Sequence, residues 1–330
     1  MDIDRYIAEN EPAWARLSFL TARARTGLRK MPSHEIDELV SLYQKSSSQL
    51  SFARGEFRDV ALNSQLTMLV AEARVVIYGT KARGARSLVQ FFSVRFPAAV
   101  WHCRRVVVIA ALITFLPALA LGTWISFSDR ALDAAAPEAV RAAYVADQFE
   151  DYYSSQPAAE FSTKVLVNNI YVSFLAFASG ILLCVPTALI LAFNGANVGL
   201  AAGLFHAAGE APRFWGLILP HGLLELSAVV IAGAAGLRLG WSVIAPGDRT
   251  RSEAIAEEGS RSSVIVMGLI LAFILAGLIE GFVTPSSLPT FMRVGIGVAV
   301  FLAFVTYIVS RGIVAERIGV TGLLREPIPS

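Results

Sequence analysis

Long apolar stretches separated by short polar segments occupy most of the chain after about residue 100. A helix needs ~20 apolar residues to cross the ~30 Å of hydrocarbon in a bilayer. Five stretches approach or exceed that length, at residues 106–127, 165–193, 214–241, 264–283 and 291–310. Only 16% of the residues are charged, against about 25% in soluble domains. The pattern therefore predicts an all-α, polytopic membrane protein.

The first 100 residues follow a different pattern, in which apolar residues recur at helical spacing, as at Leu39, Tyr43 and Leu50. We predict helices at residues 11–26, 33–54, 57–78 and 82–96. Residues 1–100 would form a cytoplasmic helical bundle, and residues 101–330 the membrane domain. The N-terminal stretch carries several arginines and no continuous apolar run, so we expect it to be retained.

Cations are concentrated just before the first span. From Ala73 to Arg105 there are seven cations and no acid. Phe92 and Phe96 add an aromatic face, which favours a basic helix in the headgroup layer of an anionic membrane; the alternative is a bundle helix that buries both rings. Cations near spans mark the cytoplasmic side, so we expect a cytoplasmic N-terminus. The predicted interfacial basic residues are Arg83, Arg86, Arg95, Arg104 and Arg105.

The segment at residues 128–164 has the opposite charge, with seven acids against three cations. An acidic, cation-poor segment after a cation-rich entry is typical of the extracytoplasmic face. Its aromatic residues would give it surface for a helical hairpin or for an external protein partner.

The number of crossings follows from the arginines. Five crossings would place Arg238, Arg249 and Arg317 outside, against the cation bias. An even number returns them to the cytoplasm, so we predict about six membrane segments. The additional segment must lie in residues 194–212, which either cross the membrane or re-enter it; their length favours re-entry. Asn194 and Gly195 favour a tight reversal there.

Ionisable residues inside the predicted spans are the candidate site. His221 and Glu225 stand four residues apart in an otherwise apolar stretch, directly after Pro220, where we expect the helix to be interrupted. Glu280 lies near the end of another apolar stretch. Such groups are costly in hydrocarbon and commonly functional. They would act as a proton-linked pair, as ligands of an ion, or as a polar anchor between helices. A structural hydrogen bond that only fixes helix packing carries about as much weight as these three functions together.

The sequence lacks the signatures of several other functions. It has no P-loop, no nucleophile elbow and no dinucleotide-binding fingerprint. His221 and Glu225 are too few ligands for zinc, and His206 is the only further donor nearby. We therefore expect no enzyme activity, no cofactor, no metal and no nucleic-acid partner. Cys103 and Cys184 are expected to be small apolar fillers.

The run at residues 219–240, which begins Leu219-Pro220-His221-Gly222, resembles the core signature of the stage II sporulation protein M family, as do Asn194-Gly195 before it and residues 276–285 after it. The resemblance implies an integral protein of the bacterial inner membrane. In spore formers, the name-bearing member accompanies peptidoglycan-degrading partners as a scaffold and not as the hydrolase. The large N-terminal part here departs from that member. The resemblance supplies no established catalytic residue.

Two functional hypotheses follow. The first is a non-catalytic scaffold or assembly factor linked to the cell envelope, with protein partners at the cytoplasmic bundle and the outer loop, and with membrane lipids around it. The second is a transporter or lipid-handling permease that uses His221, Glu225 and Glu280. The glycine-rich faces would also allow a homo-oligomer.

Overall fold

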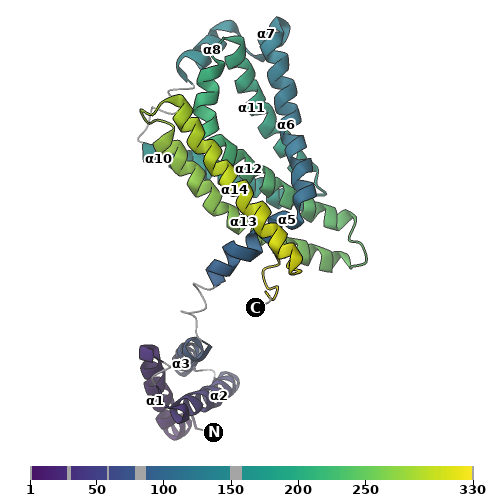
Figure 1. Ribbon diagram of the computed structural model, residues 1–330. Helices are drawn as coiled ribbons and strands as arrows, with labels where there is room; N and C mark the ends of the chain where they lie inside the picture. The colour runs from purple at the N-terminus through teal and green to yellow at the C-terminus, as the bar shows by residue number, and fades with distance from the viewer. Residues whose placement is uncertain (1, 28–30, 58, 79–86, 149–157, 329–330) are drawn as a thin grey trace. The chain divides into compact units, whose positions relative to one another are not determined.

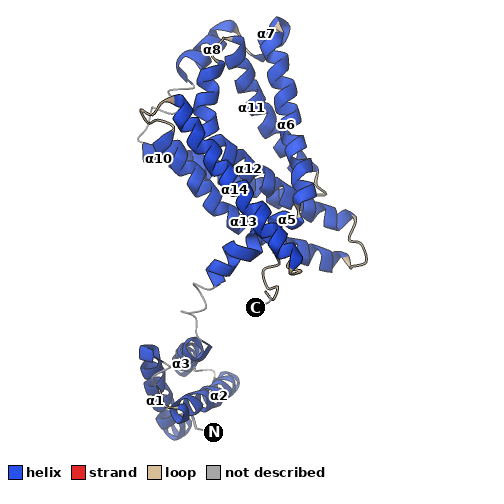
Figure 2. Ribbon diagram, in the orientation of Figure 1, coloured by secondary structure: helices blue, strands red, loops and turns tan. Residues whose placement is uncertain are grey.

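The computed structural model describes residues 2–27, 31–57, 59–78, 87–148 and 158–328. Its elements within these ranges are all helical, and no strand occurs among them (Figure 2). The chain divides into two compact units, Met1–Val89 and Gln90–Ser330. The predicted all-α, polytopic membrane fold is confirmed, with six helices long and apolar enough to cross a membrane in the described ranges.

The first unit is a bundle of α1 (Ile3–Gly27), α2 (Ser33–Glu56) and α3 (Val60–Tyr78). Apolar residues spaced three or four apart on each helix form its core, including Leu17, Leu39 and Leu66, which are fully buried. One of the six membrane-length helices is α3. Its buried residues nevertheless pack against α1 and α2.

The boundary between the units lies after Val89, not near residue 100 as predicted. The π-helical turn η2 (Phe91–Arg95) and α5 (Phe96–His102) belong to the second unit. Phe96 is buried against α13, at Gly268, and the Tyr307 hydroxyl donates to the carbonyl of Phe92. Phe92 and Phe96 of the predicted helix 82–96 therefore pack against helices of the second unit.

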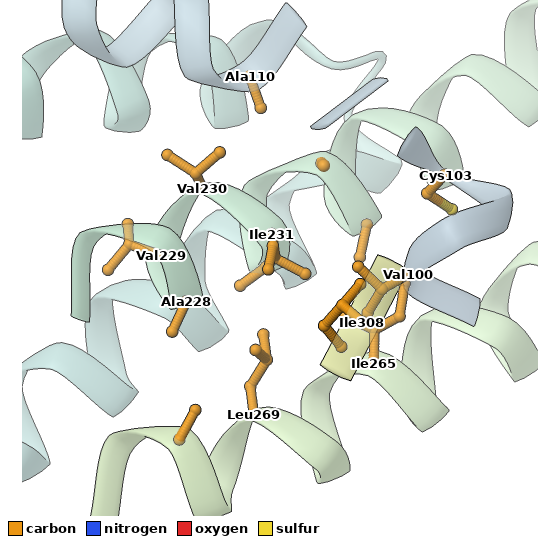
Figure 3. Close-up of a cluster of buried hydrophobic side chains, with 14 of the residues drawn as sticks. Val100, Cys103, Ala110, Ala228, Val229, Val230, Ile231, Ile265, Leu269 and Ile308 are labelled. Atoms are coloured by element: carbon orange, nitrogen blue, oxygen red, sulfur yellow. The ribbon is translucent and has the colours of Figure 1, made fainter. Parts of the chain in front are cut away.

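The second unit is built around α12 (Ala211–Ile244), which packs against all five other long helices of the unit (Figure 1). Those helices are α6 (Arg104–Phe127), α10 (Ala158–Ala178), α11 (Val185–Ala207), α13 (Arg251–Leu278, continued by the π-turn η5, Ile279–Val283) and α14 (Thr290–Arg317). Its core gathers small and branched side chains of α12 against α13 and α14 (Figure 3). Cys103 lies in this core as an apolar filler, and burial raises the pKa of its thiol to about 11.

The chain reverses earlier than predicted. Instead of one span at residues 165–193, α10 continues into the 3-10 turn η4 (Ser179–Ile181), and the backbone turns at Leu183 and Cys184, both with positive φ. Gly180 and Gly240 allow this turn to pack directly on α12. Helix α11 then runs unbroken through Asn194, so residues 194–207 complete a membrane-length helix and do not form a reversal or a re-entrant turn.

The ends of the helices support an even number of crossings. Arg104 Nη2 of α6 lies 3.0 Å from Glu316 Oε1 of α14, and Arg261 Nε of α13 donates to the carbonyl oxygen of Thr321 at 3.0 Å. Arg238, near the end of α12, pairs with α13 close to Arg261. The arginines before the first span, between α12 and α13, and after α14 therefore gather at one end of the unit.

The opposite end is capped by short helices. After α6 follow α7 (Asp129–Ala135), α8 (Glu138–Ala143) and the π-turn η3 (Tyr144–Gln148). Arg213, at the start of α12, donates to the carbonyl oxygen of Val145 at 3.0 Å, and Tyr144 packs edge-on against Phe205 of α11. The predicted acidic loop thus covers the ends of α11 and α12 and passes into α10 at Ala158, before residue 164. Its acids Glu150 and Asp151 lie outside the described residues.

Candidate functional site

Polar side chains from α10, α12 and the end of α13 meet inside the second unit. The amide of Asn169 donates to Glu225 Oε1. His221 Nε2 lies 3.8 Å from Glu280 Oε1, which is too long for a hydrogen bond. His221 Nδ1 lies 3.3 Å from Thr284 Oγ1. The structure therefore brings together the three ionisable residues that the sequence singled out, and adds Asn169 and Thr284.

These groups are shielded from solvent without a cationic partner. His221 and Glu280 are each 3% exposed and Thr284 is fully buried, while Glu225 is half-buried near the middle of α12. Within the described ranges, no Lys or Arg forms an ion pair with Glu225 or Glu280. A buried carboxylate without a cation is stable only when it is protonated or binds a cation. The arrangement therefore favours exchange of a proton or a cation.

A cavity of about 370 Å³ opens beside Glu225. Its polar wall consists of the Glu225 carboxyl, the His221 ring and three asparagine side chains, those of Asn169, Asn194 and Asn197. Asn197 is exposed and the others are partly or fully buried. The cavity is large enough for several waters or a small solute, and its lining offers amide and carboxyl oxygens to a cation.

The backbone around the site differs from the expected broken helix. Helix α12 continues through Pro220, where an interruption was predicted. Neighbouring helices make such a proline tolerable in a membrane, and Gly297 of α14 lies against the Pro220 backbone. Gly222 is buried and lines the cavity. Asn194, near the middle of α11, lines it as well. Gly195 and Gly199 carry the contact between α11 and α6 and do not make a turn.

The predicted basic residues do not form one surface. Arg104 and Arg105 are exposed at the start of α6. Arg95 is partly buried and donates to the carbonyl oxygen of Glu326. Arg83 and Arg86 lie outside the described residues.

A second charged cluster, which the sequence analysis did not identify, ties α12 to α13 at the arginine-rich end. Arg261 Nη1 lies 2.7 Å from Glu258 Oε2, and both residues are 1% exposed. Arg238 Nη2 lies 3.2 Å from Glu258 Oε1. The spacing of Glu258 and Arg261, three residues apart on one helix, was the available signal. In contrast to Glu225 and Glu280, this carboxylate is fully matched by arginine.

Over the described ranges, no three or more His, Cys, Asp or Glu side chains are grouped so that they could hold a metal ion.

The second unit matches a known family. The model of the family described as stage II sporulation protein M matches residues 111–285, which is more than half of the chain. The chain belongs to this family. The match includes Asn169, His221, Glu225 and Glu280, so the polar cluster lies wholly inside the family region, whereas α14 and the first unit lie outside it.

Other comparisons add little about activity. Residues 4–79 match a domain of unknown function (DUF8413), which coincides with the three-helix bundle. An uncharacterized protein of Methanocaldococcus jannaschii is 32% identical over 123 residues, covering 37% of this chain and 69% of the relative. No solved structure matches significantly.

Proposed function

We propose that this multi-pass membrane protein is a permease that binds a small cationic solute in the cavity beside Glu225 and exchanges it for protons. The observation that carries the proposal is the carboxyl group of Glu225 at the wall of a cavity near the middle of α12. A structural polar contact between helices needs no cavity. Because no Lys or Arg of the described residues pairs with Glu225, its carboxylate is available to a mobile cation.

The contacts within the site indicate a different role for each ionisable residue. Glu225, held by Asn169, is the group that binds solute or proton. Glu280 and His221 form an adjoining buried pair that would hold a second proton. Because two neighbouring buried carboxylates resist simultaneous ionisation, binding of a cation at Glu225 would release a proton there and leave the second proton in place.

Proton flux in vesicles tests the proposal. The full chain would be reconstituted with a pH-sensitive dye inside, and gradients of sodium or of small organic amines would be imposed as probes. We expect a probe gradient to drive proton movement. The Glu225→Gln variant should reduce the rate at least about tenfold, because hydrogen bonds to a charged group are worth ~1.5–3 kcal/mol. Glu225→Asp should retain part of the flux.

The matched control is Glu316→Gln, which removes a carboxylate at the arginine-rich end, away from the cavity. It should leave the flux unchanged. If no probe drives protons, and no probe protects Glu225 from a carboxyl-directed carbodiimide, the protein is not such a permease.

A scaffold role is the second candidate, supported by the separate first unit and its match to a domain of its own. In that case, the bundle and the short helices α7 and α8 would bind protein partners. Deletion of residues 1–78 would then abolish co-purification of protein partners from native membranes. Any proton flux of the second unit would be unchanged. For either role we propose the bacterial cytoplasmic membrane, with the N-terminus in the cytoplasm, from the distribution of arginines.

A further inference from the structure

An apolar groove separate from the polar cavity runs along α6. Its larger part, about 670 Å³, is lined by α6, α11 and α12, with Phe301 of α14. A second part, about 270 Å³, is lined by α5, α6, α12 and α14. Phe115 and Ser227 line both parts, so the two parts adjoin along α6.

The chemistry of the groove suits a hydrocarbon chain, and its length exceeds that of one acyl chain. Its lining residues on α6 extend from Arg104 to Phe127, over a helix of 24 residues, or ~36 Å at ~1.5 Å per residue. The hydroxyls of Thr123, Ser126 and Ser227 donate to carbonyls of their own helices. The wall therefore presents mainly apolar surface, and Phe115 and Leu119 are exposed along it.

One end of the groove carries positive charge. Arg104 lines it, stacks on the Trp101 ring at 4.8 Å from the ring centroid, and pairs with Glu316. The Arg104 side chain remains 42% exposed. The start of α6 and the end of α14 hold four exposed arginines against the one glutamate, namely Arg104, Arg105, Arg311 and Arg317. This surplus complements a phosphate group at headgroup depth.

We propose that the groove binds an anionic phospholipid, with its phosphate at Arg104 and Trp101 and an acyl chain along α6. The arginine surplus selects an anionic headgroup over a zwitterionic one, and Trp101 is an interface residue of the kind that borders lipid headgroups. The phosphate competes with Glu316 for Arg104 and for the Trp101 indole N–H, which donates to Glu316 Oε2 at 2.7 Å.

Quenching of tryptophan fluorescence by brominated lipids tests this proposal. Full-length variants that keep only Trp101, the other four tryptophans being phenylalanine, would be reconstituted into phosphatidylcholine vesicles. Brominated phosphatidylglycerol or brominated phosphatidylcholine would then be titrated in. We expect the anionic lipid to reach Trp101 with an apparent affinity about fivefold higher, as one cation near an anionic surface provides. A variant keeping only Trp241, which lines neither part of the groove, is the reference.

Two substitutions separate phosphate binding from a merely structural role of the ion pair. Arg104→Gln should abolish the preference at Trp101 and leave the Trp241 signal unchanged. Glu316→Gln should increase the preference, because it releases Arg104 to the phosphate. Val305→Phe, which narrows the groove, should weaken quenching by both lipids. Equal quenching by the two lipids at Trp101, the same effect from both charge variants, or no quenching because a second copy of the chain fills the groove would each overturn the proposal.

Discussion

At the scale of single residues, two buried carboxylates of the membrane unit have opposite surroundings. Glu258 is held by Arg238 and Arg261. Glu225 is held by a neutral amide beside a cavity. A carboxylate matched by arginine stabilises one arrangement of helices, whereas one without a cation is free to exchange a proton or an ion. This contrast assigns a structural role to the first and a binding role to the second.

The structural role predicts a large loss of stability. Glu258→Gln would remove the carboxylate that pairs with both Arg238 and Arg261, and would leave Arg261, which is 1% exposed, with Glu257 alone. Breaking a buried ion pair from one side costs about 3–5 kcal/mol. Because Glu257 retains part of the pairing, the free energy of unfolding in detergent, measured by chemical denaturation, should fall by an amount toward the lower end of that range. Glu316→Gln, which removes an exposed partner of Arg104, is the control and should change it little. Similar losses from the two variants would refute a special role for the buried cluster.

The sequence predicted which residues of the site are unusual, but not which residues surround them. His221, Glu225 and Glu280 were identified because each is ionisable within an apolar stretch. The partners Asn169 and Thr284 come from α10 and from the end of η5. Their contacts depend on how distant helices pack, which periodicity along one helix does not specify.

At the scale of elements, α11 and α6 form the most extensive helix pair of the unit. A Cβ atom added at Gly199 would lie 2.2 Å from the carbonyl oxygen of Ala118, and one at Gly195 would lie 1.8 Å from that of Thr114. Glycines four residues apart therefore let the two backbones approach closely. Asn and Gly also favour reversals, which is why a turn was predicted at Asn194 and Gly195. Helix packing prevailed over that local preference.

This interface predicts a strong effect of side-chain size. Gly199→Leu would force α6 and α11 apart, and overpacking of this kind costs about 1–3 kcal/mol. Thermal unfolding in detergent should show a clearly lowered midpoint. Gly295→Ala in α14 is a matched control, since nothing lies within 4 Å of its added Cβ, and it should be neutral or slightly stabilising. An unchanged midpoint for Gly199→Leu would mean that the two helices are not in close contact.

At the scale of the whole molecule, the distribution of charge indicated a further membrane segment that hydropathy alone did not separate. Hydropathy merged α10 and part of α11 into one stretch at residues 165–193, because the turn at Leu182–Cys184 is itself apolar. The arginines nevertheless required a further crossing. The structure breaks that stretch into α10 and α11. In the second unit, α6 and α11 to α14 are long and apolar enough to cross a membrane, and α10 contributes the shorter apolar stretch Val167–Ile181.

The remaining question of topology concerns α3, which is long and apolar enough to cross a membrane. Its residues Leu62, Leu66 and Ala73 are buried in the bundle with α1 and α2. Because the apolar face of α3 is used in these contacts, its polar residues, such as Gln65 and Glu72, are exposed. Such residues would be costly against lipid. We therefore expect α3 to stay outside the bilayer and the N-terminus to share a side with the loop between α12 and α13.

Labelling of single cysteines tests this topology. In a chain with Cys103 and Cys184 replaced by alanine, cysteine would be placed at Asp2, Glu138 or Asp248, all of which are exposed. A membrane-impermeant maleimide should label D2C and D248C only in inverted vesicles, and E138C only in vesicles of native orientation. If D2C instead reacted from the same side as E138C, α3 would cross the membrane. Glu138 lies in α8, just before the η3 turn that contacts the start of α12, and Asp248 follows the end of α12. Labelling of D248C and E138C from the same side would therefore mean that α12 does not cross the membrane, which would contradict the arrangement of the membrane unit itself.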